Sequence, residues 1–569
     1  MTAVGGELRA KDLTVLDTSD LPDRWITDWP TSQRFPHYTR ANAGEVLADP
    51  VSPLGWTFAW DGGIVAGYKA GLIRCGAYED SDFDATHPET VACFGGYFYI
   101  NLSAIRMQGA RNPAASVAAL DAAFFGDHPD VPTYVARPED SKPHLVPAIE
   151  AHMAWVLSRP DWPELESDRA AAAGLRAGRG DLSTLIDSEL VARARTVQAQ
   201  LPHLFSQHVV SGSSAAIAPG LLGVVADAVG LSSLPMTLLS GLGGVDSADA
   251  NYALWDLSRM DPATEEFRNA WDAFIEEFGS RGPDEWDLHS PTWETHPQLA
   301  MTVLDRVRKQ SDDESPRQRF AARVTAREAL IAETRAALAD RPDMIELLDR
   351  GLRAGQMMAN RERTKTTIVR SLHEARIAFR ELGRRHGHDE LVFQLLDGEL
   401  DSYVADPRSF TELLSQRLAA WKQLFELEPP FIIANASTPP LPLWPRRTRT
   451  NVSAAREHEE LTGVIGSTGV ARGIARIVLD PSDEREFEAG YVLVAPNTDP
   501  SWTPLFMSAA AVVVDVGGQI SHAVIVSREL GVPCVVSVTN GTRRIPEGAM
   551  VEVDGDRGVV TVLQIGDSK

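Results

Sequence analysis

The sequence predicts a multidomain protein with a mixed α+β N-terminal part, a mainly α-helical middle part and a C-terminal α/β domain. Three observations support this fold class. Residues 145–430 repeat apolar residues at three- and four-residue spacing with charges between them, which is typical of helices. Residues 431–458 are rich in proline. Residues 511–531 have the pattern of a buried strand, a glycine turn and a short helix.

The N-terminal part, residues 1–144, is rich in glycine, proline and aromatic residues, most of which we expect to be core. Short apolar pieces such as residues 96–102 predict strands. Pro50 and Pro53 follow residues 39–47 and disfavour a continuing helix. A mixed α+β fold is therefore expected here.

The helical part, residues 145–430, is interrupted by glycine and proline, for example at 241–244 and 279–283. In residues 431–458 proline alternates with small and polar residues, which predicts an extended, solvated linker that lets the last domain, residues 459–569, move. The alternative is a strap packed onto the helical domain.

Composition limits the function classes. The net charge of −25 disfavours nucleic acid and anionic membranes as partners. No apolar run is expected to span a bilayer, and the start of the chain lacks a signal segment. The three scattered cysteines and the 14 histidines form no metal-ligand motif, so we expect no metal site and a reduced, cytoplasmic setting.

His522 is the main candidate for chemistry. It follows Gly517, Gly518 and Ser521 and stands in the first turn of the predicted helix, where unpaired N–H groups favour an anion. A neutral imidazole is a competent nucleophile, so His522 could accept and pass on a phosphoryl group. The alternative is that Ser521 caps the helix and His522 is a satisfied polar residue.

The motifs around His522 occur in one order over about a hundred residues, and the module resembles the swivelling phosphohistidine domain of phosphoenolpyruvate-utilising enzymes and dikinases. The resemblance implies that His522 carries the phosphoryl group and that Gly517, Gly518 and Ser521 form its phosphate loop. Ile520 stands where several family members have threonine. The motifs are Gly466-Ser467-Thr468-Gly469, Ala471-Arg472-Gly473, Val492 to Ala495, Thr498-Asp499-Pro500, Asp515 to Ala523, and Val553-Asp554-Gly555.

Arg361 and Lys365 are the candidate phosphate-binding cations. They are four residues apart on a predicted helix, so both can reach one face and grip one phosphate. A solvated face with Glu362 paired to Lys365 is the alternative. The segment is similar to the R-E-x-x-K element of rifampicin phosphotransferases, which implies a catalytic role for the pair.

Four other polar residues could line an acceptor pocket or pin loops: Arg40, Glu45, Arg281 and Glu285. Their segments resemble the acceptor domain of rifampicin phosphotransferases and related dikinase-like proteins. Ser280 stands where many relatives are expected to have histidine, which puts an acid/base role of that loop in doubt.

No glycine-rich nucleotide loop with the lysine and acidic ligands of an ATP-grasp module is found, and neither is a pyruvate-binding barrel. The resemblance is therefore to one subunit of a split dikinase-type phosphotransferase, similar to phenylphosphate synthase. It implies that a partner ATP-grasp subunit binds Mg-ATP and loads His522, while this chain binds no cofactor.

The expected acceptor is a small-molecule hydroxyl, most simply a phenol or an alkylphenol such as a cresol. Two alternatives stay open. One is an antibiotic hydroxyl of the rifamycin type, and the other is a non-catalytic phosphocarrier or regulatory subunit.

Overall fold

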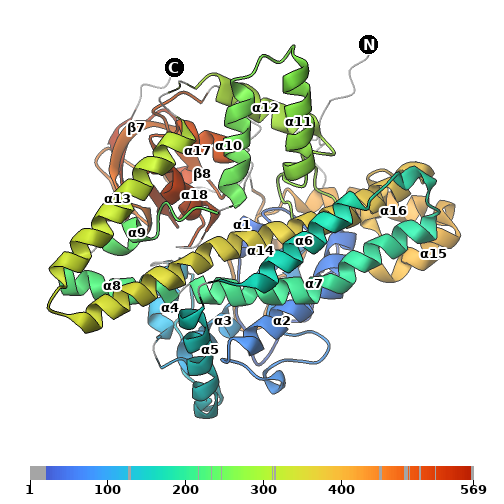
Figure 1. Ribbon diagram of the computed structural model, residues 1–569. Helices are drawn as coiled ribbons and strands as arrows, with labels where there is room; N and C mark the ends of the chain where they lie inside the picture. Colours follow the sequence, from blue (N-terminus) through green and yellow to red (C-terminus); the bar gives the residue numbers. More distant parts are fainter. Residues whose placement is uncertain are drawn as a thin grey trace.

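The computed structural model describes residues 21–565 apart from some short gaps (Figure 1). It confirms the predicted fold class, with helices through the middle of the chain and an α/β domain at its C-terminal end. Asp499, Pro500 and Ile520, which belong to the motifs quoted above, lie outside the described residues. The gaps are residues 114, 126, 127, 129, 160, 216, 232, 245, 311, 313, 314, 448–451, 480–484, 486, 499–501, 519 and 520.

The N-terminal part contains a small antiparallel sheet in the order β2-β3-β1-β4. Its aromatic residues form a continuous core, in which Trp56, Trp60 and Phe98 lie against one another. The prediction that most N-terminal aromatics are core is thus confirmed. The elements are β1 (Tyr38–Thr39), α1 (Ala43–Val46), the π-helix η2 (Gly55–Ile64), α2 (Val65–Arg74), β2 (Val91–Phe94), β3 (Tyr97–Asn101), α3 (Leu102–Arg111) and α4 (Val117–Phe125).

The helical body is built around α14 (Pro342–His386), a helix of 45 residues that runs across the molecule (Figure 1). It packs against α6, α7 and α8, and a left-handed Gly387 ends it. The other helices are α5 (Val146–Ser158), α6 (Pro163–Ala177), α7 (Asp187–Ala215), α8 (Ile217–Val229), α9 (Leu234–Leu238), α10 (Asp246–Ser258), α11 (Glu265–Phe278), α12 (Pro297–Arg308), α13 (Pro316–Ala337), α15 (Leu400–Ala405) and α16 (Thr411–Leu424).

One stretch of the described chain, Asp187–Val229, is long and apolar enough to cross a membrane by length and composition, although the sequence predicts no such run. Of its most apolar window, 47% is buried inside the protein. The stretch comprises α7 and α8, which both pack on α14. Its apolar character is therefore accounted for by the core of the helical body.

The predicted linker differs from the expectation along its first half, residues 431–447. β4 (Ile432–Ile433) pairs with β1, and Trp444 is buried beside the Tyr97 ring. Arg447 binds Asp49 at 3.0 Å. The large apolar side chains between the prolines dock this half on the N-terminal sheet, so it is a packed strap.

The C-terminal domain contains an eight-stranded mixed sheet in the order β5-β12-β11-β7-β8-β9-β10-β6. The central strands β7, β8, β9 and β10 are parallel. The strands are β5 (Glu460–Thr462), β6 (Val464–Ser467), β7 (Val470–Ile477), β8 (Val492–Ala495), β9 (Ala511–Val514), β10 (Cys534–Val536), β11 (Met550–Asp554) and β12 (Val559–Gln564); the helices are α17 (Thr503–Ser508), α18 (His522–Leu530) and α19 (Gly541–Arg544).

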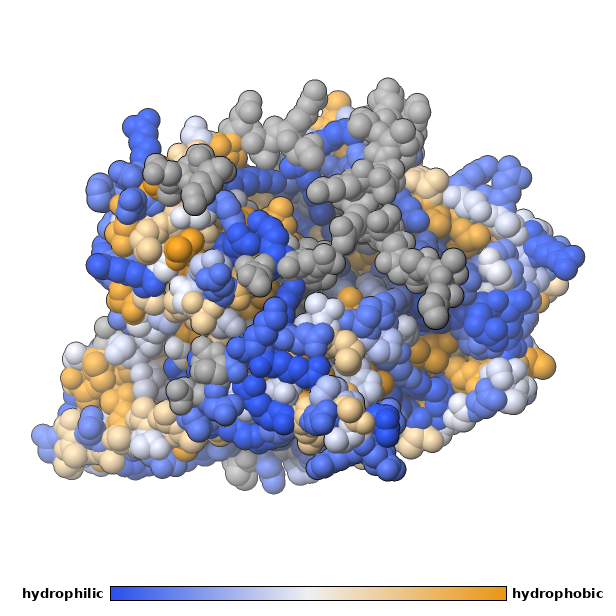
Figure 2. All heavy atoms as spheres, turned by 90° about the horizontal axis from the view of Figure 1, so that it is seen from above, coloured by the Kyte–Doolittle hydropathy of each residue, from blue (hydrophilic) through white to orange (hydrophobic). Residues whose placement is uncertain are grey.

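This domain is docked on the helical body, beside α9, α10 and α13 (Figure 1). Ile525 of α18 packs against Ala359 of α14. Polar contacts include Asn497 Nδ2 donating to Gly44 O at 2.6 Å and Gln310 Nε2 to Ser508 Oγ at 2.7 Å. On the face that Figure 2 shows, hydrophilic residues are mixed with smaller hydrophobic patches.

Candidate functional site

His522 is the first residue of α18, directly after the strand β9 and the glycine turn. Ser521 is the N-cap, and its Oγ accepts a hydrogen bond from Val524 N at 3.4 Å. A Cβ on Gly517 would lie 3.1 Å from Val536 Cβ, so glycine lets the turn pack closely on β10. The turn and cap thus fix the imidazole at the positive end of the helix.

The two ring nitrogens of His522 have different surroundings. Nδ1 lies 3.2 Å from Thr498 Oγ1, whereas Nε2 is buried without a hydrogen-bond partner among the described residues. Phe506 packs edge-on against the ring at 6.0 Å between centroids. When Thr498 accepts a hydrogen bond from Nδ1–H, the lone pair of Nε2 is free to act as the nucleophile.

Arg361 and Lys365 of α14 both face the docked domain, and each side chain is 15% exposed. Arg361 binds Glu362 at 3.1 Å, and Lys365 Nζ lies 3.1 Å from Glu285 Oε1. The alternative of a solvated face with Glu362 paired to Lys365 therefore does not describe the structure. The two cations are held by different carboxylates at the domain boundary.

Arg281 and Glu285 lie in the loop between α11 and α12, and both are buried. Arg281 Nη1 donates to Glu285 at 3.2 Å, and its Nη2 donates to Thr366 Oγ1 at 3.0 Å. Burial alone would raise the pKa of Glu285, but Lys365 and Arg281 outweigh it and hold this pKa below its usual value. The loop therefore adds a third cation beside Lys365.

All three cations act on His522. Burial, and then the charges of Lys365, Arg281 and Arg361 in that order, hold the pKa of His522 well below its usual value. The imidazole is therefore neutral and nucleophilic at physiological pH. The same positive charge would stabilise a phosphoryl group on its Nε2.

Glu45 of α1 also reaches this boundary, and its Oε1 is buried without a partner among the described residues. Burial raises its pKa to about 8, an effect that Arg361 and the Gly518 backbone N–H reduce. Glu45 is therefore largely protonated near neutral pH and can donate a hydrogen bond.

Arg40, in contrast, does not reach His522. Its buried guanidinium donates to the carbonyl oxygens of Phe98 at 2.6 Å and of Leu47 and Ala48 at 2.9 Å. Of the two roles that the sequence leaves open, the structure supports loop pinning. Arg40 shapes the segment that carries Glu45.

His208 of α7 is a site residue that the sequence analysis missed. Its Nδ1 lies 3.0 Å from Thr364 Oγ1, and its ring packs beside Phe205 and Trp286. Burial, together with Arg361 and Lys365, lowers its pKa to about 3. A lone histidine in a helical apolar pattern gives no sequence signal, because the fold alone brings α7 beside this part of α14.

Two segments of the chain match known families. Residues 487–558 match the mobile domain of PEP-utilising enzymes, and residues 205–362 match the fourth domain of rifampicin phosphotransferase. The second match includes His208 and Arg361, and the first includes His522.

Curated relatives agree with these matches. The chain is 31% identical to the rifampicin phosphotransferase of Streptomyces sviceus over 333 residues, which cover 57% of this chain and 37% of the relative. It is 30% identical to the chondramide synthase of Chondromyces crocatus over 380 residues, which cover 58% of this chain and 10% of that relative. It is 49% identical to a probable phosphoenolpyruvate synthase of Staphylothermus marinus over 100 residues, which cover 17% of this chain and 12% of that relative.

The chain thus spans well under half the length of these relatives. Its two matched segments are the ones that meet at the docked boundary, where His522 faces the cations of the helical body. In these two segments the chain is therefore similar to the mobile domain of PEP-utilising enzymes and to the fourth domain of rifampicin phosphotransferase.

Proposed function

We propose that this chain transfers a phosphoryl group from Nε2 of His522 to the hydroxyl of a small-molecule acceptor. The observation that carries the proposal is the burial of an unpartnered Nε2 where Lys365, Arg281 and Arg361 all act on the ring. Phosphoryl transfer requires positioning and positive charge around the phosphate oxygens rather than covalent chemistry by the protein. This boundary supplies both.

In the transfer step, the N–P bond to His522 breaks as the acceptor oxygen forms an O–P bond. Arg361 and Lys365 stabilise the phosphoryl oxygens during the transfer. His208 takes the hydroxyl proton as general base. Burial and then Arg361 and Lys365 lower its pKa in the free site, and the negative phosphoryl group that these cations bind would offset their charge and raise this pKa toward the range of a working base. Glu45, in its protonated form, donates a hydrogen bond to the phosphoryl group or the acceptor.

The loading step is proposed to occur away from this boundary. A nucleotide-binding module of the ATP-grasp type, on a partner subunit, would phosphorylate His522 from Mg-ATP while the mobile domain is undocked. AMP and phosphate would be the by-products. Docking then brings the phosphohistidine to the cations, which is the position seen here.

A phenol or alkylphenol such as a cresol is the proposed acceptor. The aromatic core reaches the site through His208, whose ring lies 5.4 Å from that of Phe205 and 6.0 Å from that of Trp286. Flat aromatic walls beside the base suit a flat aromatic alcohol. A rifamycin-type hydroxyl is the second candidate, favoured by the match to rifampicin phosphotransferase.

Transfer can be tested without the partner subunit. Phosphoramidate would phosphorylate His522 chemically, and ³¹P NMR would then follow the signal after addition of p-cresol or rifampicin. We expect loss of the phosphohistidine signal and growth of an aryl phosphate. His522→Ala should lack the phosphohistidine signal that is lost on addition of the acceptor and should form no aryl phosphate, whereas His203→Ala, which alters an exposed histidine paired with Asp168, should behave as wild type.

The outcomes separate the three functions. Transfer to rifampicin alone would replace the phenol by the antibiotic acceptor. Loaded His522 that passes its phosphoryl group to neither class, while a partner ATP-grasp protein still exchanges it, would indicate a phosphocarrier and contradict the acceptor role.

A further inference from the structure

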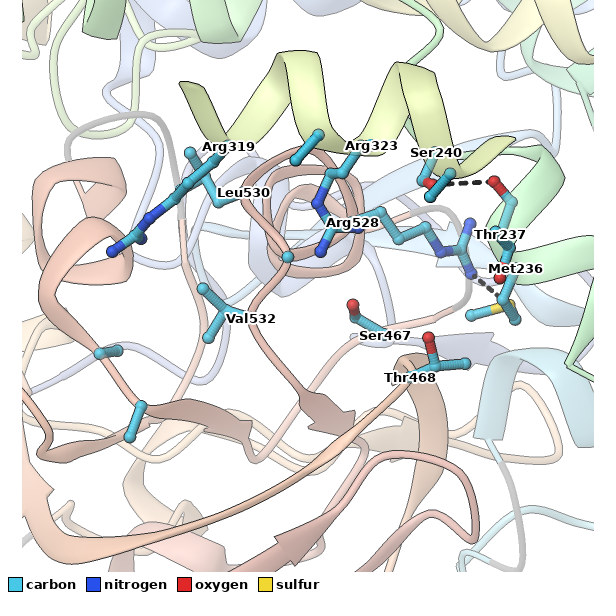
Figure 3. A pocket seen from close by; sticks show the side chains of 15 residues that line it. Met236, Thr237, Ser240, Arg319, Arg323, Ser467, Thr468, Arg528, Leu530 and Val532 are labelled. Atoms are coloured by element: carbon cyan, nitrogen blue, oxygen red, sulfur yellow. Dashed lines mark hydrogen bonds between the residues drawn. The ribbon is translucent and has the colours of Figure 1, made fainter. Parts of the chain in front are cut away.

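A cleft lies between the mobile domain and the helical body, at the C-terminal end of α18 (Figure 3). Its volume is about 460 Å³, within the range of small-ligand sites. Arg323 comes from α13 on the helical body, whereas Arg528 comes from α18 and Ser467 and Thr468 from the end of β6. The cleft therefore has walls on both domains.

The polar groups of this cleft converge. In Figure 3 the Arg323 side chain extends from α13 toward Leu530, and the hydroxyls of Ser467 and Thr468 rise from the opposite wall. Neither hydroxyl forms a hydrogen bond within the described part of the chain. Three side chains with free donors thus point into one space.

Neither Arg323 nor Arg528 forms an ion pair with a carboxylate in the described part of the chain. Arg528 is buried and donates to Gly466 O at 2.9 Å and to Met236 Sδ at 3.5 Å, which are both uncharged. Arg323 has no hydrogen bond or ion pair among the described residues. Burial lowers the pKa of both groups, that of Arg528 to about 10, and this effect outweighs the opposing charge of Glu529.

Two neighbouring groups offset this charge only in part. The C-terminal end of α18 contributes about half a negative charge against two guanidinium groups. Glu529 acts on the pKa of Arg323, but its own carboxylate takes backbone hydrogen bonds from Leu242 and Gly241, and burial raises its pKa. A net positive cleft therefore remains in a chain whose net charge is −25.

We propose that this cleft binds a phosphate-bearing anion and that the bound anion holds the mobile domain on the helical body. Guanidinium groups and hydroxyls are the usual donors to phosphate oxygens. Because the site exists only when both walls meet, the anion binds the docked form alone and shifts the population toward it. The site regulates docking and is distinct from the His522 boundary.

Calorimetric titration of the whole protein with inorganic phosphate, and separately with AMP, tests the proposal. Arg323→Ala should weaken binding at least about tenfold, since a charge-assisted interaction is lost. Thr468→Val, which keeps the shape of the side chain, should weaken it a few-fold. Arg335→Ala, on the same helix but paired with Asp349, should leave binding unchanged.

Hydrogen–deuterium exchange provides the second measurement. Phosphate should slow exchange in α13 and in residues 464–468 over the same concentration range, and not in the Arg323→Ala variant. Binding of AMP but not phosphate would identify the anion as a nucleotide monoester. Failure of both, or unchanged binding in Arg323→Ala and Thr468→Val, would overturn the proposal.

Anion binding in the cleft can be tested independently of phosphoryl transfer by His522, on which the proposed function rests. Lys365→Ala and His522→Ala alter the other boundary and should keep phosphate binding in the cleft. A cleft that binds phosphate in a protein whose His522 never becomes phosphorylated would support the regulatory site and reject the transfer function. Phosphoryl transfer by His522 in a protein whose cleft binds neither phosphate nor AMP would support the transfer function and reject the regulatory site.

Discussion

The two ends of α18 both meet arginines of the helical body, but their charge balance differs. At the N-terminal end, Lys365 and Arg281 share Glu285, and Arg361 pairs with Glu362. At the C-terminal end, Arg528 and Arg323 have no ion pair among the described residues. One helix thus has cations that are held in ion pairs at its start and arginines without such pairs at its end.

The difference indicates two kinds of anion occupancy. A phosphoryl group that arrives and leaves on His522 requires cations that stay ordered in its absence, and paired carboxylates keep them in place. Unpaired buried charge is costly and is best explained by a ligand that remains bound. The comparison predicts that the first end controls transfer rate and the second controls docking.

Replacing Lys365 should have the largest effect. Lys365→Ala removes a charge from the phosphoryl oxygens and should slow transfer to the acceptor about 10²- to 10³-fold. Chemical loading of His522 should remain near wild type, measured by ³¹P NMR. The matched control is Arg350→Ala, which removes an exposed arginine that pairs with Glu346 on the same helix. A loading defect without a transfer defect would contradict the assignment.

His208→Asn should slow transfer about 10²-fold if His208 removes the acceptor proton. A phenol loses its own proton near pH 10. The variant rate should therefore rise with pH toward that value and approach wild type, whereas a merely structural defect would not be rescued. The measurement is the single-turnover rate to p-cresol between pH 7 and 10. A parallel pH profile in both proteins would remove His208 from the base role.

Glu45→Gln should have the smallest effect of the three substitutions, and this effect should be on the pH dependence of the melting temperature. The pKa of Glu45 in the native protein is about 8, above its usual 4.5, so the native state binds a proton that the unfolded chain releases. Native stability from this group is lost as pH rises from about 4.5 through 8. The melting temperature of wild type should fall relative to Glu45→Gln by a few degrees over this window, because a pKa raised from 4.5 to about 8 corresponds to about 5 kcal/mol. If the melting temperatures of wild type and Glu45→Gln changed in parallel with pH, Glu45 would not bind a proton in the native state, and the prediction would be wrong.

Most of the fold class and part of the site could be predicted from local sequence. The strand, glycine turn and helix around His522 follow from short-range patterns, and the spacing of Arg361 and Lys365 follows from helix geometry. His208 could not be found, because its role arises from the packing of α7 on α14. Similarly, the ion pair of Lys365 with Glu285 requires a loop 80 residues earlier in the chain, which spacing cannot reveal.

The linker prediction is wrong over residues 431–447, where the alternative of a packed strap holds, for a different reason. Proline predicts an extended backbone correctly, but it does not indicate whether the intervening apolar residues will find a surface. Leu441 and Trp444 do find one, on the N-terminal sheet, and they convert an expected arm into a strap. Whether Arg40 lines an acceptor pocket or pins loops likewise depends on contacts between distant parts of the chain, which the sequence does not reveal.

The packed strap also sets a limit on how far His522 can travel. Arg447 is anchored on the N-terminal part, and Ala455 N already bonds Arg544 O inside the mobile domain at 2.7 Å. Seven residues, 448–454, join them, and at about 3.5 Å per residue their contour length is about 25 Å. Because this connection is short, the C-terminal domain can move far from its docked position mainly by rotating about it. The proposed loading partner would therefore have to dock within reach of that rotation.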